Sequence, residues 1–229
     1  MRLNIAVILL IAVWQCFSVR AEARKKDFVV VVDAGHGGKD AGASGRYAKE
    51  KDINLAISKK LDKVVRKNTK GIKVVMTRRK DEYVTLKDRA GFANFVNADL
   101  FISVHSNASE KNPNAYGTEV YVHRQSSAAS ERLARIIAEK LRTHARRNDK
   151  GVKKANFQVL RESTMPGVLV EVGFISNRME EEFISSKNGV RLIAESIYLA
   201  VSEYVYGYAP SDIKRSRKDS KMARKSWRI

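Results

Sequence analysis

The feature that most constrains this chain is a regular alternation of apolar strand-like segments with amphipathic helix-like segments. Residues 28–32 (FVVVV) form a continuous β-branched run, which is typical of a strand buried on both faces. A glycine-rich loop leads from this run to residues 52–66, where apolar side chains recur at helical spacing. This alternation predicts an α/β fold, a single domain with a mostly parallel or mixed twisted sheet and helices on both faces.

Further strands are expected at 72–77, 100–104, 118–122 and 167–172, and further helices at 127–144 and 188–206. Another helix is predicted to open after Thr85 as its N-cap. The apolar residues that this helix is expected to bury are Leu86, Ala90, Ala93 and Phe95. The sequence shows no internal repeat and no second folded domain.

Three polar residues, His36, His105 and Glu171, lie at or just beyond the carboxyl ends of predicted strands. In open α/β sheets, ligands bind at these ends. The three residues are far apart in the sequence, but this architecture can bring them to one edge of the sheet. We therefore expect the functional site at that edge.

The four histidines are the first place to look for a metal site, because a catalytic zinc commonly has three His or Asp/Glu ligands. His36 stands between glycines, and His105 ends an apolar run. His123 continues into a polar segment, and His144 lies in a basic stretch that is typical of a solvated helix face. Each histidine alone is also compatible with an ordinary hydrogen-bonded loop residue.

Two glutamates have alternative interpretations. Glu50 alone fits an acid in the first turn of a helix, where it is favourable against the helix dipole. Glu171 interrupts an apolar strand, where burying a carboxylate is costly unless it is paired or bound to a metal. A structural ion pair is the alternative for Glu171.

The net charge of +19 and the pI near 10.1 indicate an anionic partner.

A secretory signal is predicted over residues 1–23, with an uncleaved membrane anchor as the alternative. The prediction rests on Arg2, an apolar run of residues 5–17 and the small-x-small pattern of residues 21–23. The single cysteine, Cys16, falls inside this segment, which excludes disulfides and thiolate chemistry from residues 24–229. Export makes nucleic acid an unsuitable partner.

The predicted organisation is a signal peptide (1–23), a catalytic domain (24–210) and a basic, disordered tail (211–229). The tail carries eight basic residues and two acidic ones. It is expected to hold the protein near anionic wall polymer or a membrane surface, or else to act only as a solubilising segment.

Four motifs stand in order along residues 28–205. They are residues 32–38 (VDAGHGG) with Asp40, Gly42, Ala43, Lys49 and Glu50; Thr77 and Arg78 with Asp81, Leu86, Arg89, Ala93 and Asn94; residues 103–108 (SVHSNA) with 117–119 (GTE); and residues 170–177 (VEVGFISN). With these motifs the chain resembles the amidase-3 family of zinc-dependent N-acetylmuramoyl-L-alanine amidases. The resemblance covers nearly all of the predicted domain.

The resemblance implies that His36, Glu50 and His105 bind one zinc ion and that Glu171 is the catalytic glutamate. It also implies hydrolysis of the amide between N-acetylmuramic acid and L-alanine in peptidoglycan, at the periplasm or the cell wall. Asp33 is a candidate partner for the second nitrogen of a ligand histidine, or else a strand-end loop residue. Asn107 either contacts substrate or fixes the loop after His105. We expect a monomer.

Some relatives carry a long insertion before the closing motif, with a helix that plugs the zinc site. Only about twenty residues join the 127–144 helix to the strand at 167 here, so we expect an open site. A zinc peptidase or deacetylase is the alternative enzyme, because fold alone does not fix function. A non-catalytic wall-binding module would require a lost ligand or base, and all four residues are present.

Overall fold

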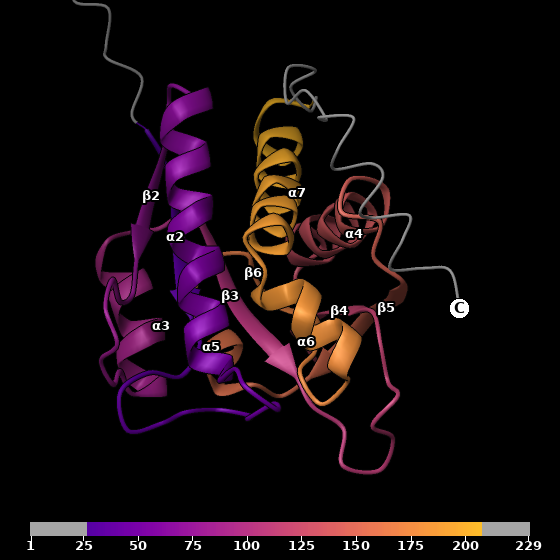
Figure 1. Cartoon of the computed structure of the whole chain (residues 1–229). Coiled ribbons are helices and arrows are strands. Elements are labelled where there is room, and N and C mark those ends of the chain that lie inside the picture. The colour runs from indigo at the N-terminus through magenta and orange to yellow at the C-terminus, as the bar shows by residue number, and fades with distance from the viewer. Residues whose placement is uncertain (1–26, 208–229) are drawn as a thin grey trace, which may run out of the picture.

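The computed structural model describes residues 27–207, so the predicted signal peptide and basic tail lie outside the described part of the chain. These residues form one six-stranded sheet in the order β2-β1-β3-β6-β4-β5. The strands are β1 (Phe28–Ala34), β2 (Ile72–Met76), β3 (Leu100–Asn107), β4 (Thr118–His123), β5 (Asp149–Ala155) and β6 (Gly167–Phe174). The helices are α2 (Glu50–Asn68), α3 (Leu86–Phe95), α4 (Ala128–Thr143), α5 (Gln158–Arg161), α6 (Arg178–Ser185) and α7 (Lys187–Tyr206) (Figure 1).

The sheet is mixed, as predicted. Strands β2, β1, β3 and β6 run parallel to one another, while β4 pairs antiparallel with β6 and parallel with β5. The carboxyl ends of β1, β3 and β6 therefore meet at one edge, which we call the carboxyl edge. The opposite edge, where these strands begin, is called the amino edge.

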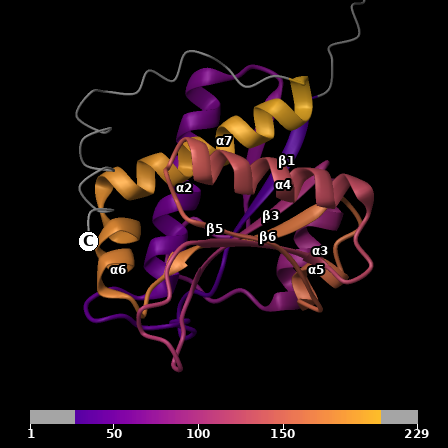
Figure 2. The ribbon, with the colours of Figure 1, turned by 90° about the vertical axis from the view of Figure 1, so that its right-hand side faces the viewer.

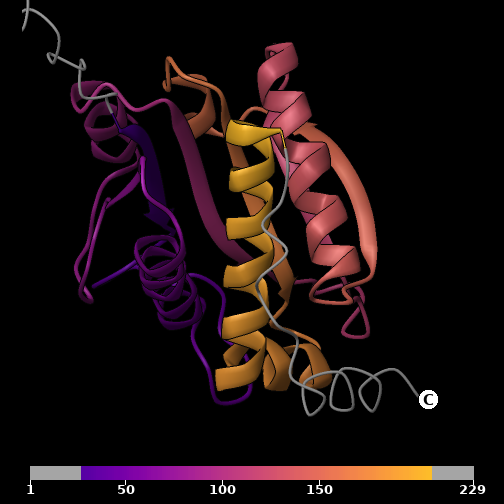
Figure 3. The ribbon, with the colours of Figure 1, turned by 90° about the horizontal axis from the view of Figure 1, so that it is seen from above.

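Helices cover both faces of the sheet (Figure 2). On one face of the sheet, α2, α4 and α7 pack against alternate residues of the strands. Figure 3 shows α7 lying between α2 and α4. On the other face α3 and α5 pack over a smaller cluster that includes Val31, Phe101 and Leu169. This arrangement confirms helices on both faces and explains why the central strands are apolar throughout.

Strand β5 and the short helices α5 and α6 were not predicted. Strand β5 (DKGVKKA) has no apolar run because it lies at the edge of the sheet, where its lysines reach solvent. Helices of 4 and 8 residues are too short to show a periodic pattern.

Helix α3 begins as predicted, since the Thr85 side chain accepts a hydrogen bond from the Asp88 backbone N–H. The prediction of its buried face was half wrong. Ala90 and Ala93 are fully buried, but Leu86 and Phe95 are 51% and 83% exposed. The two lie at opposite ends of a short helix, and its middle residues Arg89, Ala90 and Ala93 are the ones that it buries.

No helix within residues 27–207 is long and apolar enough to cross a membrane. The path from β4 to β6 contains only α4, β5 and α5, which agrees with the expected lack of room for a plug helix.

We predict that Leu61→Ala, in the buried face of α2, lowers the free energy of unfolding by about 2–5 kcal/mol, because it leaves a cavity in a fully closed core. Lys63→Ala on the exposed face of the same helix is expected to change it by less than about 0.5 kcal/mol. Chemical denaturation measures both. Equal losses would show that α2 is not held by its apolar face.

Candidate metal centre

The loop after β1 has an uncommon backbone conformation, and its glycines lie in close contact with the candidate ligand side chains. His36 has a left-handed backbone with φ 60°, uncommon for a non-glycine residue. Gly35 passes so close to the ring of His105 that an added Cβ would lie 2.3 Å from its Cε1 atom. At Gly42 an added Cβ would lie 2.6 Å from Glu50 Oε2 and 2.7 Å from His36 Cδ2. These glycines let the three candidate ligands approach one another.

Two buried arginines hold this loop by its carbonyl groups. Arg89 donates to the carbonyl oxygens of Ala34 and His36, each at 2.7 Å. Arg78 donates to the carbonyl oxygens of Ala34 at 2.8 Å and Gly35 at 2.9 Å. Both arginines are almost fully buried. The left-handed backbone of His36 is therefore fixed from beneath by charged donors.

Asp33 balances the charge of Arg89. Its Oδ1 accepts from Arg89 Nη1 and Thr77 Oγ1, each at 2.7 Å, and its Oδ2 accepts from Ser103 Oγ at 2.7 Å. Burial raises the pKa of Asp33, but the charge of Arg89 and these hydrogen bonds outweigh it, and the pKa is lowered overall. Asp33 is thus a buried anion that anchors the arginine.

Glu50 is the first residue of α2, and its carboxylate is oriented by several donors. Oε2 accepts from the Ala43 N–H at 2.8 Å. Oε1 accepts from the Ser106 N–H at 3.1 Å and from Asn54 Nδ2 at 3.3 Å. The prediction of a helix first-turn acid is correct for its position, but the side chain turns inward and is 5% exposed.

The turn just before Glu50 is held by another carboxylate. Glu181 of α6 accepts from the backbone N–H groups of Arg46, Tyr47 and Ala48 at 2.8–3.0 Å. Burial raises the pKa of Glu181, but these three donors lower it below the ordinary value. Helix α6 thereby fixes the segment that delivers Glu50 to the site.

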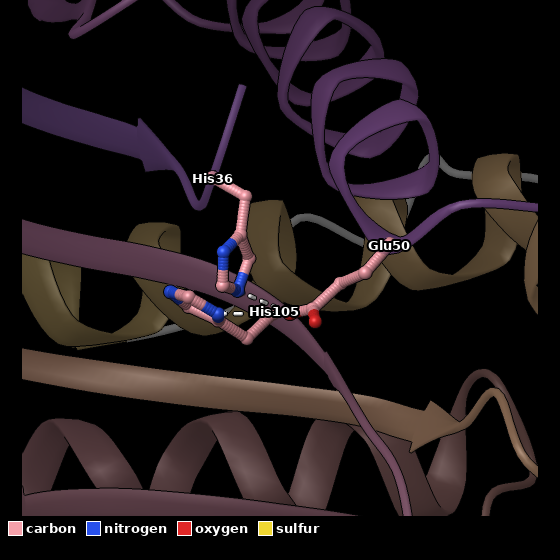
Figure 4. Close-up of side chains that lie close together, drawn as sticks. All are labelled: His36, Glu50 and His105. Atoms are coloured by element: carbon pink, nitrogen blue, oxygen red, sulfur yellow. Dashed lines mark hydrogen bonds and ion pairs between the residues drawn. The ribbon is translucent and has the colours of Figure 1, made fainter. Parts of the chain in front are cut away.

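His36, Glu50 and His105 point toward one another (Figure 4). Glu50 Oε1 lies 3.2 Å from His36 Nε2 and 2.9 Å from His105 Nδ1, and one ligand atom from each residue falls within 4.8 Å of the others. In a tetrahedral zinc site the bonds are about 2.0–2.2 Å long, which places neighbouring ligand atoms roughly 3.3 Å apart. A set of two imidazoles and one carboxylate at this spacing fits a zinc ion.

The electrostatics of the group agree with cation binding. Burial raises the pKa of Glu50, but hydrogen bonds and charges from His105 and His36 hold it far below its ordinary value. Burial lowers the pKa of His36, while contacts with Glu50 and Asp40 raise it to about 9. The carboxylates of Glu50 and Asp40 thus place negative charge against the imidazole rings, and a divalent cation bound there would neutralise it.

The carboxylate that contacts a candidate ligand histidine is Asp40, not Asp33. Asp40 Oδ2 lies 2.8 Å from His36 Nδ1, so the Nδ1–H can donate to it while Nε2 faces Glu50. The prediction for Asp33 was wrong because this residue of β1 faces α3, where it meets Arg89, whereas Asp40 returns to His36 through the glycine turn. The alternative, a structural residue at the strand end, describes Asp33.

Glu171 lies beside His105 in the sheet, because the two residues are register partners in β3 and β6. Within the described residues, its Oε2 is buried and has no hydrogen-bond partner. Burial raises the pKa of Glu171 to about 7, with the charges of Glu50 and Glu119 adding to the effect and that of His105 opposing it. The alternative of a structural ion pair finds no support in these contacts.

Glu119 faces Glu171 across the antiparallel pair of β4 and β6 but has a different environment. It accepts from Lys153 Nζ at 2.6 Å, Tyr121 Oη at 2.7 Å and Asn107 Nδ2 at 3.1 Å. Asn107 Oδ1 also accepts from the Ala108 N–H at 2.8 Å. The expectation that Asn107 fixes the loop after His105 is therefore supported, and Glu119 is a fully satisfied carboxylate beside an unsatisfied one.

The other two histidines lie away from this group. His123 Nε2 contacts Asn156 Oδ1 at 3.2 Å on an exposed surface. His144 Nε2 contacts Glu195 Oε2 at 3.2 Å and is partly buried, so the prediction of a solvated face was wrong for His144. It caps the carboxyl end of α4, where a histidine is favourable.

A family model described as N-acetylmuramoyl-L-alanine amidase matches residues 30–203. The chain belongs to this amidase family. The family assigns the chain an enzymatic activity, that of an N-acetylmuramoyl-L-alanine amidase, with peptidoglycan as its substrate class.

Individual relatives agree with the family. The chain is 37% identical over 182 residues to the probable cell wall amidase LytH of Staphylococcus saprophyticus, covering 78% of this chain and 59% of LytH. It is 41% identical over 150 residues to the N-acetylmuramoyl-L-alanine amidase LytC of Bacillus subtilis, covering 65% of this chain but 29% of LytC. A crystal structure of N-acetylmuramoyl-L-alanine amidase from Clostridium difficile 630 superposes with a TM-score of 0.76 at 36% identity, covering 79% of this chain and 97% of that one.

Sequence reasoning gave no role to the residues that hold the site in place. Asp40, Arg78 and Arg89 stand in the amidase motifs, but spacing alone does not show which backbone groups they contact. Glu181 lies 131 positions beyond Glu50, and only the tertiary fold brings its carboxylate to the turn before Glu50. Glu180 and Glu181 stand in the first turn of α6, a helix that was not predicted, so no sequence signal pointed to Glu181.

We predict that Asp33→Asn destabilises the amidase by about 3–5 kcal/mol at neutral pH, because it leaves Arg89 buried without its counter-charge. A carboxyl whose pKa is lowered by folding stabilises the protein above its ordinary pKa of 3.8 and loses that contribution as the pH falls through the lower, folded-state pKa. The difference in unfolding free energy between wild type and variant should therefore shrink in acid. A difference that stays constant down to acid unfolding would contradict this assignment.

We also predict that Asp40→Asn weakens metal binding by about 10–100-fold, because the neutral amide supports His36 Nδ1–H less well than a carboxylate does. Competition with a chromogenic zinc chelator measures the affinity. Asp88→Asn, an exposed acid at the start of α3, is the matched control and should bind zinc as wild type does. Equal affinity for wild type and Asp40→Asn would remove Asp40 from the metal centre.

Proposed function

We propose that this protein is a zinc-dependent N-acetylmuramoyl-L-alanine amidase in which His36, Glu50 and His105 hold one zinc ion and Glu171 is the catalytic base. The observation that carries the proposal is the convergence of three ligand atoms next to a buried carboxylate with an unsatisfied oxygen. The absence of cysteine from residues 24–229 leaves imidazole and carboxylate as the ligand types, which suits zinc.

A zinc ion held by these residues would supply a Lewis acid that polarises the scissile carbonyl and acidifies water. The remaining steps fall to the chain itself. Glu171, with a pKa raised to about 7 by burial, is poised to accept a proton from the attacking water near neutral pH. The same carboxyl then donates that proton to the departing amine of L-alanine. Asp40 keeps the proton of His36 on Nδ1, which leaves Nε2 as the electron-pair donor.

The surrounding framework explains why Glu171 rather than Glu119 serves as the base. Glu119 accepts hydrogen bonds from Lys153 on Oε1 and from Tyr121 and Asn107 on Oε2. Both of its oxygens are therefore already engaged with donors of the protein. Glu171 has no such donor on Oε2, so its proton affinity remains high.

We further propose that the protein is exported and acts at the cell wall, in the periplasm or outside the cell. The pattern of residues 1–23 supports export, and the relative LytH is named a probable cell wall amidase. Peptidoglycan is then both the substrate and the principal partner. The short path from β4 to β6 supports a site that is open without an activator.

The test is zinc analysis and digestion of purified sacculi by wild type and Glu171→Gln. We expect the variant to retain one equivalent of zinc and to lose activity by about 10²–10⁴-fold, because the amide cannot take up the proton. Glu139→Gln, an exposed acid on α4, is the matched control and should retain both. His105→Ala should lose zinc and activity together.

Mass spectrometry of the products distinguishes the enzyme classes. An amidase releases stem peptides with a free L-alanine amine, whereas a peptidase leaves the muramic acid substituted and a deacetylase releases acetate. Loss of zinc from Glu171→Gln would make Glu171 a ligand and contradict its role as base.

A further inference from the structure

The exposed side of α2 carries an unusual concentration of positive charge. Residues 59–73 contain seven basic residues and one acid. Lys59, Lys63 and Lys67 are exposed and spaced by four residues, so they lie along one side of the helix. Lys70, also exposed, continues the row into the turn after α2. We call these four lysines the lysine row.

The lysine row is not neutralised within the fold. Among residues 27–207, none of its members lies within ion-pair distance of a carboxylate. The one acid of the stretch, Asp62, is buried and contacts Arg66 at 2.5 Å and Arg79 at 2.9 Å. Like charges four residues apart destabilise a helix, and no ion pair among the described residues offsets this repulsion.

Both ends of the described chain meet at this row. The Phe28 N–H donates to the Gly71 carbonyl at 2.8 Å, and Tyr206 Oη donates to the Lys70 carbonyl at 3.0 Å. Figure 1 shows the carboxyl ends of α2 and α7 at the same end of the molecule. Residues 24–26 (RKK) directly precede the first of these contacts, and the basic residues 211–229 follow shortly after the second. In the sequence, basic residues thus precede the first of these contacts and follow the second.

This place lies at the amino edge of the sheet, away from the metal centre. Strand β1 starts beside Gly71 and ends at Ala34, next to the candidate ligand His36. A seven-residue strand separates the two by roughly 20 Å, at about 3.3 Å per residue. A partner bound at the lysine row therefore leaves the carboxyl edge uncovered.

We propose that the lysine row, with the turn at Lys70 and Gly71, is a docking surface for an anionic lipid bilayer. A charged plane is a partner that the exposed lysines of one row can contact at once. Trp227 and Ile229, set among the cations of the 211–229 sequence, favour a bilayer over a soluble polyanion because tryptophan partitions into the membrane interface. If the proposed function holds, docking points the metal centre away from the membrane and toward the wall.

The test is sedimentation of the protein from Arg24 onward, which keeps every described residue, with vesicles of phosphatidylcholine with or without phosphatidylglycerol. We expect binding only to the anionic vesicles, and loss of binding at high salt. The variant K63Q/K67Q/K70Q should bind them roughly 100-fold more weakly, at about fivefold for each lysine removed near the surface. Deleting residues 211–229 should weaken binding further in the same variant.

The matched control is K87Q/K111Q/K187Q, which removes three exposed lysines from segments that follow the carboxyl ends of β2, β3 and β6. It should bind as wild type does. Equal loss in both variants would reduce the effect to net charge and overturn the proposal. Binding to soluble poly(glycerol phosphate) but not to vesicles would assign the row to a wall polymer instead. Sacculus digestion by K63Q/K67Q/K70Q should equal that of wild type, and this readout tests the proposed function independently of docking.

Discussion

The buried ion pair between Asp33 and Arg89 is the interaction on which the candidate metal centre depends. A guanidinium removed from water is costly, and it persists only where a carboxylate and several acceptors surround it. Here the acceptors are backbone carbonyls of the loop that carries His36. If this loop moved, Arg89 would lose acceptors and remain as an unsatisfied buried cation. That cost holds the loop in place. A left-handed histidine, which costs backbone energy by itself, is held in place by that penalty.

The direction of the strands explains the division of labour among the carboxylates at the carboxyl edge. His105, Glu171 and Glu119 are register partners across β3, β6 and β4, so their side chains stand in a row on one face of the sheet. Glu50, a candidate ligand, reaches the same row from α2, and its hydrogen bonds and the nearby histidines hold its pKa far below the ordinary value. Glu119 accepts hydrogen bonds from Lys153 and Tyr121, whereas Glu171 is desolvated and its Oε2 has no donor among the described residues. Chemically identical groups thus acquire different roles from their neighbours.

Much of this arrangement follows from sequence patterns, and the rest depends on contacts that patterns do not encode. The apolar run of β1 and the helical spacing of α2 predicted the layers, and strand ends predicted where His36 and His105 would meet. Asp33 and Asp40 are both acids near the loop of His36, and only the pleat of β1, which directs Asp33 toward Arg89 of α3, distinguishes them. Strand β5 was missed because an edge strand needs no apolar run, and Phe95 was misplaced because helical spacing does not reveal how closely a short helix approaches the sheet.

The same strand direction that gathers the ligands also separates them from the positive charge. In a parallel sheet, every strand that ends at the metal centre begins at the opposite edge, so the amino end of β1 and the end of α2 are placed together on the far side. A cluster of lysines near the site would repel a divalent cation and compete with His36 and His105 for Glu50. Placing the lysine row toward the end of α2 avoids this conflict. The lysine charges then lie farther from the candidate metal centre than the Debye length, which is about 8 Å at physiological ionic strength. The fold can therefore carry a strongly basic surface and a cation site in one small domain.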